Sequence, residues 1–170
     1  MKSLFELGEV KGAIFGGPGD IFRYTLDRVW DFNLTRVLWC MLNPSTADAD
    51  KNDPTIRRCI NFTKAWGYGG LHVCNAFALR STDPTLLYKA ADPVGEMNDS
   101  YIVDLRMRCS IVICAWGQHG KFNGRDQHLL KLLAKFGDVH CLKLNTDGTP
   151  RHPLYVSSKT KPIVMIRGAA

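Results

Sequence analysis

The chain has 170 residues, 45% of them hydrophobic and 22% charged, a composition that excludes a disordered, collagen-like or coiled-coil protein and fits one domain over residues 1–170. No run approaches the roughly 18 apolar residues of a membrane span, and the first residues lack the charged and apolar regions of a secretion signal, so we expect a cytoplasmic protein with no membrane partner. The 22 lysines and arginines against 16 aspartates and glutamates give a net charge of +6 at pH 7, which favours a polyanionic partner such as nucleic acid.

The first elements along the chain are predicted to form an N-terminal β-hairpin. Residues 13–15 and 22–30 have strand-like composition, and a glycine-rich turn over residues 16–20 separates them. No Gly-Lys-Ser/Thr sequence follows those glycines, so we interpret them as a turn and not as a phosphate-binding loop.

Four short apolar runs follow, with helical segments between them. The runs span residues 37–42, 71–76, 111–116 and 139–144, and the helices are predicted over residues 54–66, 97–108 and 127–136. Asp53 and Pro54 suit the N-cap and the first position of the first helix. Nearly continuous apolar runs are typical of parallel strands buried on both faces. The order of elements therefore predicts an α/β three-layer sandwich with a four-stranded, mainly parallel sheet and the hairpin beside it.

The six cysteines are predicted to be reduced. Cys40, Cys74, Cys114 and Cys141 lie inside the apolar runs, where a free thiol behaves as a small hydrophobic group. No two cysteines have the two-residue spacing of a zinc or redox motif, so we expect no metal site.

Polar residues follow the predicted strands. Asn43 follows the first strand, Asn75 ends the second, His119 follows the third and His152 lies beyond the fourth. Taken singly, Asn43 would start a turn, Asn75 would satisfy loop backbone and His152 would lie on the surface. Sites in an open parallel sheet form at the carboxyl ends of the strands, however, and this common location predicts a functional site.

Five segments together resemble the bacterial and phage domain of unknown function family 1643. They are Leu42–Asp48, Asp53–Arg58, Trp66–Gly69, Ala115–Gly117 and His152–Tyr155. The resemblance extends from about Tyr24 to Tyr155 and implies no activity.

The strand ends also resemble, more distantly, those of the uracil-DNA glycosylase superfamily. Asn43-Pro44-Ser45 is similar to its water-activating motif, which is Asp-Pro-Tyr or Asn-Pro-Gly in two branches. Its pyrimidine-reading strand, Leu-Trp-Gly strand end and His-Pro-Ser-Pro loop are similar to residues 75–80, 115–117 and 152–155. The resemblance implies that superfamily's fold and a DNA glycosylase, a hydrolase of N-glycosyl bonds that flips a pyrimidine out of DNA for base excision and repair.

The resemblance also implies roles for the matching residues. His152 would donate to the base carbonyl and stabilise the departing base anion. Asn75 would pair with the N3–H and O4 of uracil or thymine and reject cytosine. Asn43 would orient the attacking water, because a carboxamide is no base. Ser45, where the uracil-specific branch has a tyrosine, leaves room for thymine or a 5-modified phage pyrimidine.

Other residues complete the expected site. Phe62 or Trp66 would stack on the base, and Pro44 and Tyr155 would join the substrate-binding set. A groove that binds single- or double-stranded DNA in a salt-dependent way is expected from Arg57, Arg58, Lys64, Arg80 and Lys159. The superfamily's phosphate-gripping Ser-Pro is replaced by residues 154–155, and the terminal cysteines of its iron–sulfur branch have no match, so we expect no cofactor. We expect a monomer.

Three alternatives stay open. The protein could be an N-glycosidase for free nucleosides or nucleotides, or a non-catalytic module that reads a modified base, which the missing carboxylate at Asn43 favours. It could also be a metal-dependent nuclease or phosphoesterase built on Asp48, Asp50 and Asp53, against the simpler interpretation that Asp53 caps a helix and the other two are solvated. Activity that survives a chelator would exclude the metal-dependent enzyme.

Overall fold

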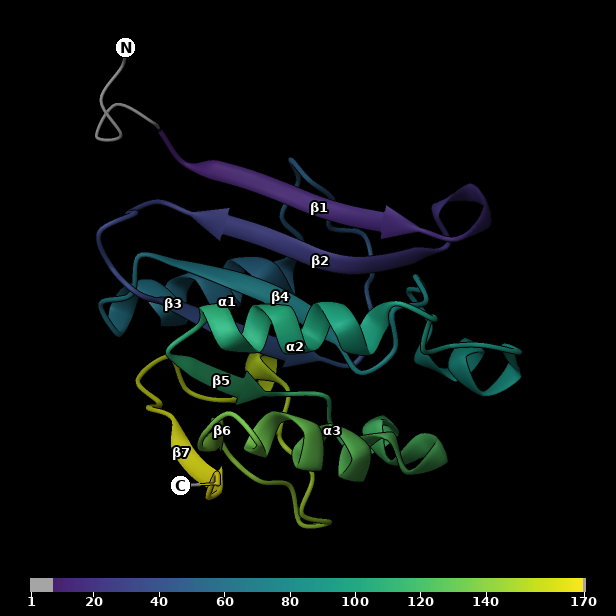
Figure 1. Ribbon diagram of the computed structural model, residues 1–170. Coiled ribbons are helices and arrows are strands. Elements are labelled where there is room, and N and C mark those ends of the chain that lie inside the picture. The colour runs from purple at the N-terminus through teal and green to yellow at the C-terminus, as the bar shows by residue number, and fades with distance from the viewer. Residues whose placement is uncertain (1–7, 170) are drawn as a thin grey trace.

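The computed structural model describes residues 8–169, which form an α/β fold around one sheet of seven strands (Figure 1). The strands are β1 (Val10–Gly16), β2 (Phe22–Val29), β3 (Arg36–Met41), β4 (Gly70–Asn75), β5 (Ile111–Cys114), β6 (Val139–Cys141) and β7 (Ile163–Ile166). The helices are α1 (Pro54–Ala65), α2 (Asn98–Arg108) and α3 (Arg125–Ala134). All four apolar runs are confirmed as strands, and the three predicted helices begin and end within two residues of their expected bounds.

The strand order across the sheet is β1-β2-β4-β3-β5-β6-β7. The four central strands β4, β3, β5 and β6 are parallel, whereas β1, β2 and β7 pair antiparallel with their neighbours. The prediction of four strands is therefore wrong. The hairpin is confirmed, but it belongs to the same sheet as the central strands. Strand β2 pairs with β4, with Leu26 opposite Val73, and Leu26 is buried. Strand β7, which was not predicted, covers the edge of β6.

Helices cover both faces of the sheet, with α2 and α3 in front and α1 behind it in Figure 1. Neighbouring residues of each central strand point into opposite layers. Leu38 and Cys40 pack with α2 and α3, while Val37 and Trp39 pack with α1. The three-layer arrangement is thus confirmed, and burial on both faces explains why the strands are continuously apolar.

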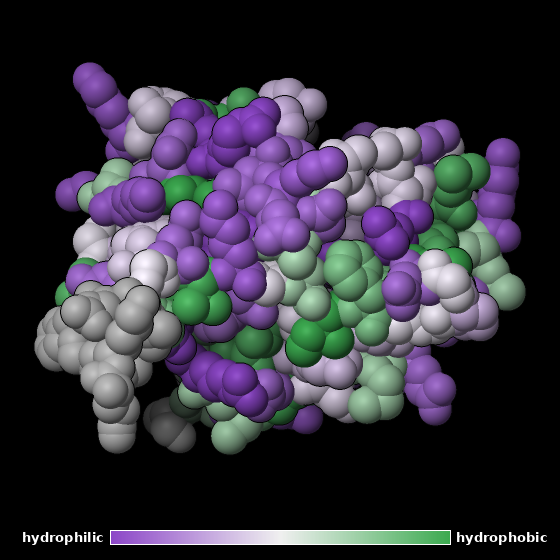
Figure 2. Space-filling model, turned by 90° about the horizontal axis from the view of Figure 1, so that it is seen from above, coloured by the Kyte–Doolittle hydropathy of each residue, from purple (hydrophilic) through white to green (hydrophobic). Residues whose placement is uncertain are grey.

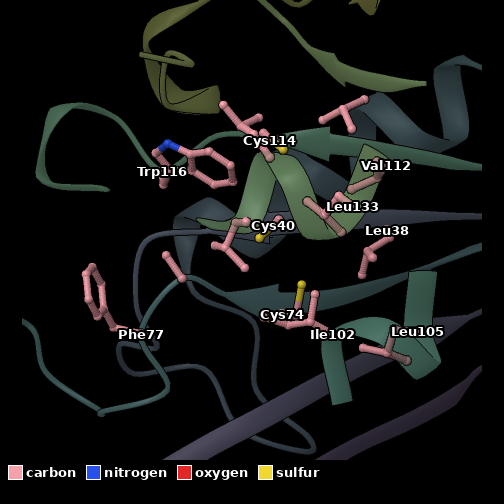
Figure 3. Close-up of a cluster of buried hydrophobic side chains, with 14 of the residues drawn as sticks. Leu38, Cys40, Cys74, Phe77, Ile102, Leu105, Val112, Cys114, Trp116 and Leu133 are labelled. Carbon is pink, nitrogen blue, oxygen red and sulfur yellow. The ribbon is translucent and has the colours of Figure 1, made fainter. Parts of the chain in front are cut away.

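Most of the cysteine side chains lie in the layer between the sheet and the helices α2 and α3. Figure 3 shows Cys40, Cys74 and Cys114 among leucine, isoleucine and valine side chains. All six cysteines are buried free thiols. Burial raises the pKa of Cys109 to about 12 and that of Cys141 to about 11, so these thiols remain protonated at neutral pH.

The β1 edge of the sheet is polar. Seen from above, over β1, the molecule carries mainly hydrophilic residues with hydrophobic ones scattered between them (Figure 2). Lys11 on β1 pairs with Glu9 at 3.6 Å. Charged side chains of this kind discourage pairing with a strand of another chain. Within residues 8–169, none of the helices has the length and apolar character needed to cross a membrane.

Candidate functional site

A cavity of about 750 Å³ opens where the chain leaves the carboxyl ends of β3, β4 and β5. Small-molecule sites in proteins usually measure roughly 300–1000 Å³, so this one has the size of a ligand site. It is lined by Asn43, Ser45, Asn75, His152 and Tyr155, five of the eight residues expected to bind substrate or catalyse. The edge of the sheet predicted to hold the site is therefore the edge with the cavity.

Asn43 lies in the loop after β3, with its amide end fixed. Its Nδ2 donates to the backbone oxygens of Ser81 at 2.9 Å and Pro44 at 3.2 Å. The Pro44 oxygen also accepts the N–H of Ser81, so the buried Pro44 supports the loop and does not line the cavity. Asn43 Oδ1 has no partner among the described residues. It is therefore free to accept a hydrogen bond from a molecule in the cavity.

Asn75 is the last residue of β4 and is 1% exposed. Its Nδ2 is buried without a hydrogen-bond partner in the described part of the chain, and its Oδ1 accepts no hydrogen bond from a described residue. Buried polar groups are nearly always paired, and leaving one unpaired costs about 1–3 kcal/mol. The Asn75 carboxamide thus lies on the cavity wall with hydrogen-bonding capacity that the described residues do not use.

His152 caps the short 3₁₀ turn Pro153–Tyr155, and its Nδ1 accepts the backbone N–H of Leu154 at 3.3 Å. A nitrogen that accepts a hydrogen bond has no proton, so a neutral His152 ring carries its proton on Nε2. Burial lowers the pKa of His152, while the nearby Asp53 acts in the opposite direction. His152 is thus a neutral ring with an Nε2–H donor at neutral pH.

The two remaining expected residues lie nearer the surface. Ser45 is half-buried and lines the cavity. Tyr155 is 74% exposed, with its ring centroid 5.6 Å from that of His152. Tyr155 therefore belongs to the rim of the cavity.

Phe62 and Trp66 do not line the cavity, so the prediction that either stacks on a base is wrong. Phe62 is buried, and Trp66 stacks on Trp39 with ring centroids 5.7 Å apart. The two aromatic rings pack in the layer between the sheet and α1, Phe62 from α1 itself and Trp66 from the residue that follows its last turn. Both side chains therefore contribute to the hydrophobic core and not to the cavity.

The five expected DNA-binding cations do not gather in one groove. Arg58 donates to the backbone oxygens of Pro153 and Val156 and lies over the Phe62 ring, so it ties the His152 loop to α1. Lys64 lies over the Trp30 ring in the last turn of α1, whereas the first turn of α1 borders the cavity. About 13 Å of helix therefore separates Lys64 from the site.

Three other cations are accessible. Arg57 donates to the Asn52 oxygen at 2.6 Å, Arg80 donates to the Asp20 oxygen at 3.0 Å, and Lys159 is exposed. Arg80 directly precedes Ser81, which lines the cavity. A further arginine, Arg151, lines the cavity itself and donates from Nε to Asn145 Oδ1 at 2.9 Å.

Asp53 is both the helix cap that the sequence predicts and a cavity residue. Its Oδ1 accepts the N–H of Ile56 at 2.8 Å. It is the one carboxylate among the described residues that line the cavity. Asp48 instead accepts the N–H groups of Asp50 and Lys51, and within residues 8–169 no three potential ligand side chains are placed to hold a metal ion. The aspartates of the metal-dependent alternative do not form a cluster.

Arg23 and Trp116 are cavity residues for which the sequence analysis gave no role. Each is 2% exposed and has a buried N–H without a partner in the part of the chain that the structure describes, Nε of Arg23 and Nε1 of Trp116. Arg23 is one of two arginines in strand β2, and Trp116 ends an apolar run. Neither pattern shows on which side of the sheet a side chain lies.

The comparisons with known proteins give one match. The family model described as Protein of unknown function (DUF1643) matches residues 23–154, the stretch from Arg23 to the residue before Tyr155. No curated protein and no solved structure matches the chain. The comparisons therefore add no support for the glycosylase resemblance, and function must be argued from the cavity.

Proposed function

The chain belongs to the DUF1643 family, whose description assigns no activity, and from its cavity we propose a glycosylase-like hydrolase that binds a pyrimidine and cleaves its N-glycosidic bond. The observation that supports this most is the unpaired carboxamide of Asn75, on the same cavity as the Nε2–H donor of His152 and the free Oδ1 of Asn43.

Asn75 suits the recognition of uracil, thymine or a 5-modified pyrimidine. Its carboxamide offers one acceptor and one donor side by side, which complement N3–H and O4. Cytosine presents an unprotonated N3 and an amino group, so it would set donor against donor. Because the side chain is almost fully buried, a wrong base would leave its polar atoms unpaired at a cost of about 1–3 kcal/mol.

His152 suits the stabilisation of the leaving base. When the C1′–N bond breaks, its electron pair goes to the base, and negative charge develops on the base carbonyl oxygens. An Nε2–H donor that meets this charge in the transition state would contribute about 3–4 kcal/mol, as preorganised donors do. The neutral tautomer is already selected by the Leu154 N–H on Nδ1.

Asn43 and Asp53 suit the handling of water. Water that attacks C1′ must lose a proton as the new C–O bond forms. Asn43 Oδ1 can accept a hydrogen bond from this water and orient it. Asp53 Oδ1 is used by the Ile56 N–H, which leaves Oδ2 to receive the proton and to stabilise the oxocarbenium-like sugar.

The test is base release. The protein is incubated with single- and double-stranded oligonucleotides that carry uracil, mismatched thymine or 5-hydroxymethyluracil, and with the free nucleotides. Alkali reveals abasic sites and chromatography detects the free base. We expect release that survives a chelator and collapses in His152→Ala, while Asp53→Asn retains the helix cap and loses turnover.

Each other result points to a different function. Tight binding of one modified oligonucleotide without base release from any substrate would favour the non-catalytic reader. Release from free nucleotides alone would favour the nucleotide N-glycosidase. Loss of release with the chelator would contradict the mechanism.

A further inference from the structure

The strand β2 contains two buried arginines that differ in how their donors are used. Arg28 is fully buried and donates to five oxygens, on Asn52, Asp27, Asp48, Lys51 and Gly12. Arg28 therefore has partners enough to serve as a structural anchor for the loop between β3 and α1.

The side chain of Arg23 makes one hydrogen bond among the described residues, from Nη1 to the Ala47 oxygen at 2.5 Å. Its Nε is buried without a hydrogen-bond partner, and its Nη2 donates no hydrogen bond to another residue in the range 8–169. Asp53 is the acid that raises the pKa of Arg23 most, yet the two form no ion pair within the described chain. A guanidinium has five N–H donors, so most of those on Arg23 lack partners.

Burial lowers the pKa of Arg23 to about 10, so the side chain is still charged at neutral pH. A buried charge without partners is costly, and Arg23 lines the cavity. The planar guanidinium fork matches phosphate oxygens in a bidentate way.

Arg23 and Asn75 lie at the same edge of the sheet. Beyond the paired residues of β2 and β4, the N–H of Arg23 donates to the oxygen of Ala78 at 2.9 Å, so β2 runs beside the segment that follows Asn75. The cavity thus contains an amide suited to the hydrogen-bonding edge of a pyrimidine and a cation suited to an anion. A nucleotide has both a base edge and an anionic phosphate.

We propose that Arg23 binds a phosphate group of the substrate, so that the cavity takes a pyrimidine nucleotide as a unit and not the base or nucleoside alone. The choice of a pyrimidine rests on the proposed function, whereas the phosphate contact rests on Arg23 alone.

The test compares thymidine with ligands that carry the same base and one or more phosphate groups. Calorimetry measures the affinity of the full chain for thymidine, for thymidine 3′- and 5′-monophosphate, and for a single-stranded oligonucleotide with one internal thymidine. We expect at least one phosphorylated ligand to bind at least tenfold more tightly than thymidine. Arg23→Gln should reduce this ratio to near one, and Arg23→Lys, which keeps the charge without the fork, should give an intermediate ratio.

Arg108→Gln is the matched control, because it removes the same charge from an exposed position at the end of α2. It should leave the ratio unchanged. Tighter binding of a monophosphate than of thymidine indicates that the cavity takes a free nucleotide. Tighter binding of the oligonucleotide alone indicates a nucleotide flipped from a strand.

Equal affinity of the wild type for thymidine and every phosphorylated ligand would overturn the proposal, and this result needs no variant to fold. A folded Arg23→Gln protein with an undiminished ratio would also overturn it. Base release is measured separately. A phosphate preference that depends on Arg23, without base release, would retain this inference while the hydrolase proposal fails.

Discussion

Asn98 holds the peptide of Asn75, with Asn98 Nδ2 at 2.9 Å from the Asn75 backbone oxygen. The same Nδ2 lies 3.3 Å from the oxygen of Ala76, which also accepts from Arg125 Nε at 2.6 Å. Asn98 begins α2 and Arg125 begins α3. The strand end that carries the Asn75 carboxamide is therefore fixed by α2 and α3.

Asn98→Ala should destabilise the protein and weaken substrate discrimination. The change leaves buried backbone oxygens without their donor, which costs about 1–3 kcal/mol. Urea unfolding measures the stability, and release of uracil against cytosine measures the discrimination. Asn61→Ala, at an exposed position of α1, should change stability by less than about 0.5 kcal/mol. Equal stability of the two variants would contradict the role of Asn98.

Asn43→Asp should lower the proposed activity, although it adds the carboxylate that the uracil-specific branch of the glycosylase superfamily has at this point of the motif. Asn43 Nδ2 donates to the oxygens of Pro44 and Ser81, and an aspartate would set a carboxylate oxygen against these carbonyls. We expect a loss of about 1–3 kcal/mol in stability together with slower base release. Single-turnover cleavage and thermal unfolding check both. Faster release at unchanged stability would show that the loop rearranges.

Asn75→Ala should impair recognition as well as turnover. Asn75 would contact the base before and during cleavage, so its loss weakens binding and blurs discrimination against cytosine. His152→Ala should instead spare binding, because its donor is needed mainly as charge develops. Equilibrium binding and single-turnover rates are measured for each variant on the same oligonucleotide. Identical losses of affinity in both variants would contradict the division of roles.

Stability should fall as the pH drops below about 6.5, in part because of His152. Burial lowers the pKa of His152 from its ordinary value of 6.5, so the unfolded chain binds the proton first. The stabilising effect of the neutral ring is present above 6.5 and is lost as the pH falls through the lowered pKa. His152→Gln should therefore lose less stability than the wild type between pH 7 and pH 5, as measured by urea unfolding. His140→Gln should act likewise, because burial also lowers the pKa of His140. If neither variant changes the slope of stability against pH, the two histidines are not the cause of the loss of stability.

Gly120→Ala should deform the cavity wall. A Cβ at position 120 would lie 2.1 Å from Cδ1 of Trp116, so the indole would have to move. Overpacking of this kind costs about 1–3 kcal/mol and should weaken ligand binding. Gly8→Ala is the control, since a Cβ there meets no atom of residues 8–169 within 4 Å. Thermal unfolding and calorimetry are the measurements, and an unaltered affinity would exclude contact between ligand and indole.

The strands, helices and hairpin could be predicted because their signals are local. Continuous apolar runs, the Asp53 cap and the glycine-rich turn each act within a few residues. The seven-stranded sheet could not be predicted in the same way, because the pairing of β2 with β4 joins segments about 45 residues apart. Strand β7 has four residues with exposed or half-buried side chains, so its sequence has no buried pattern to recognise.

The residues whose position in the site depends on strand topology could be predicted. Those whose position depends on the direction of a side chain could not. Asn43, Asn75 and His152 share a cavity because parallel strands end at one edge. Phe62 was misplaced, although buried residues on α1 at positions 56, 59, 60 and 63 follow the spacing of a core-facing stripe beside it. Arg23 was missed because nothing local marks which arginine of a strand lacks partners.

The six buried thiols can be used to detect local unfolding of the protein. A thiol reagent must reach the sulfur, and in the native state all six thiols are buried, so labelling requires an opening of the surrounding structure. Cys59 lies in the layer with α1, whereas Cys40, Cys74 and Cys114 lie in the layer with α2 and α3. Mass spectrometry of labelled peptides would therefore follow the two layers separately in one unmodified chain.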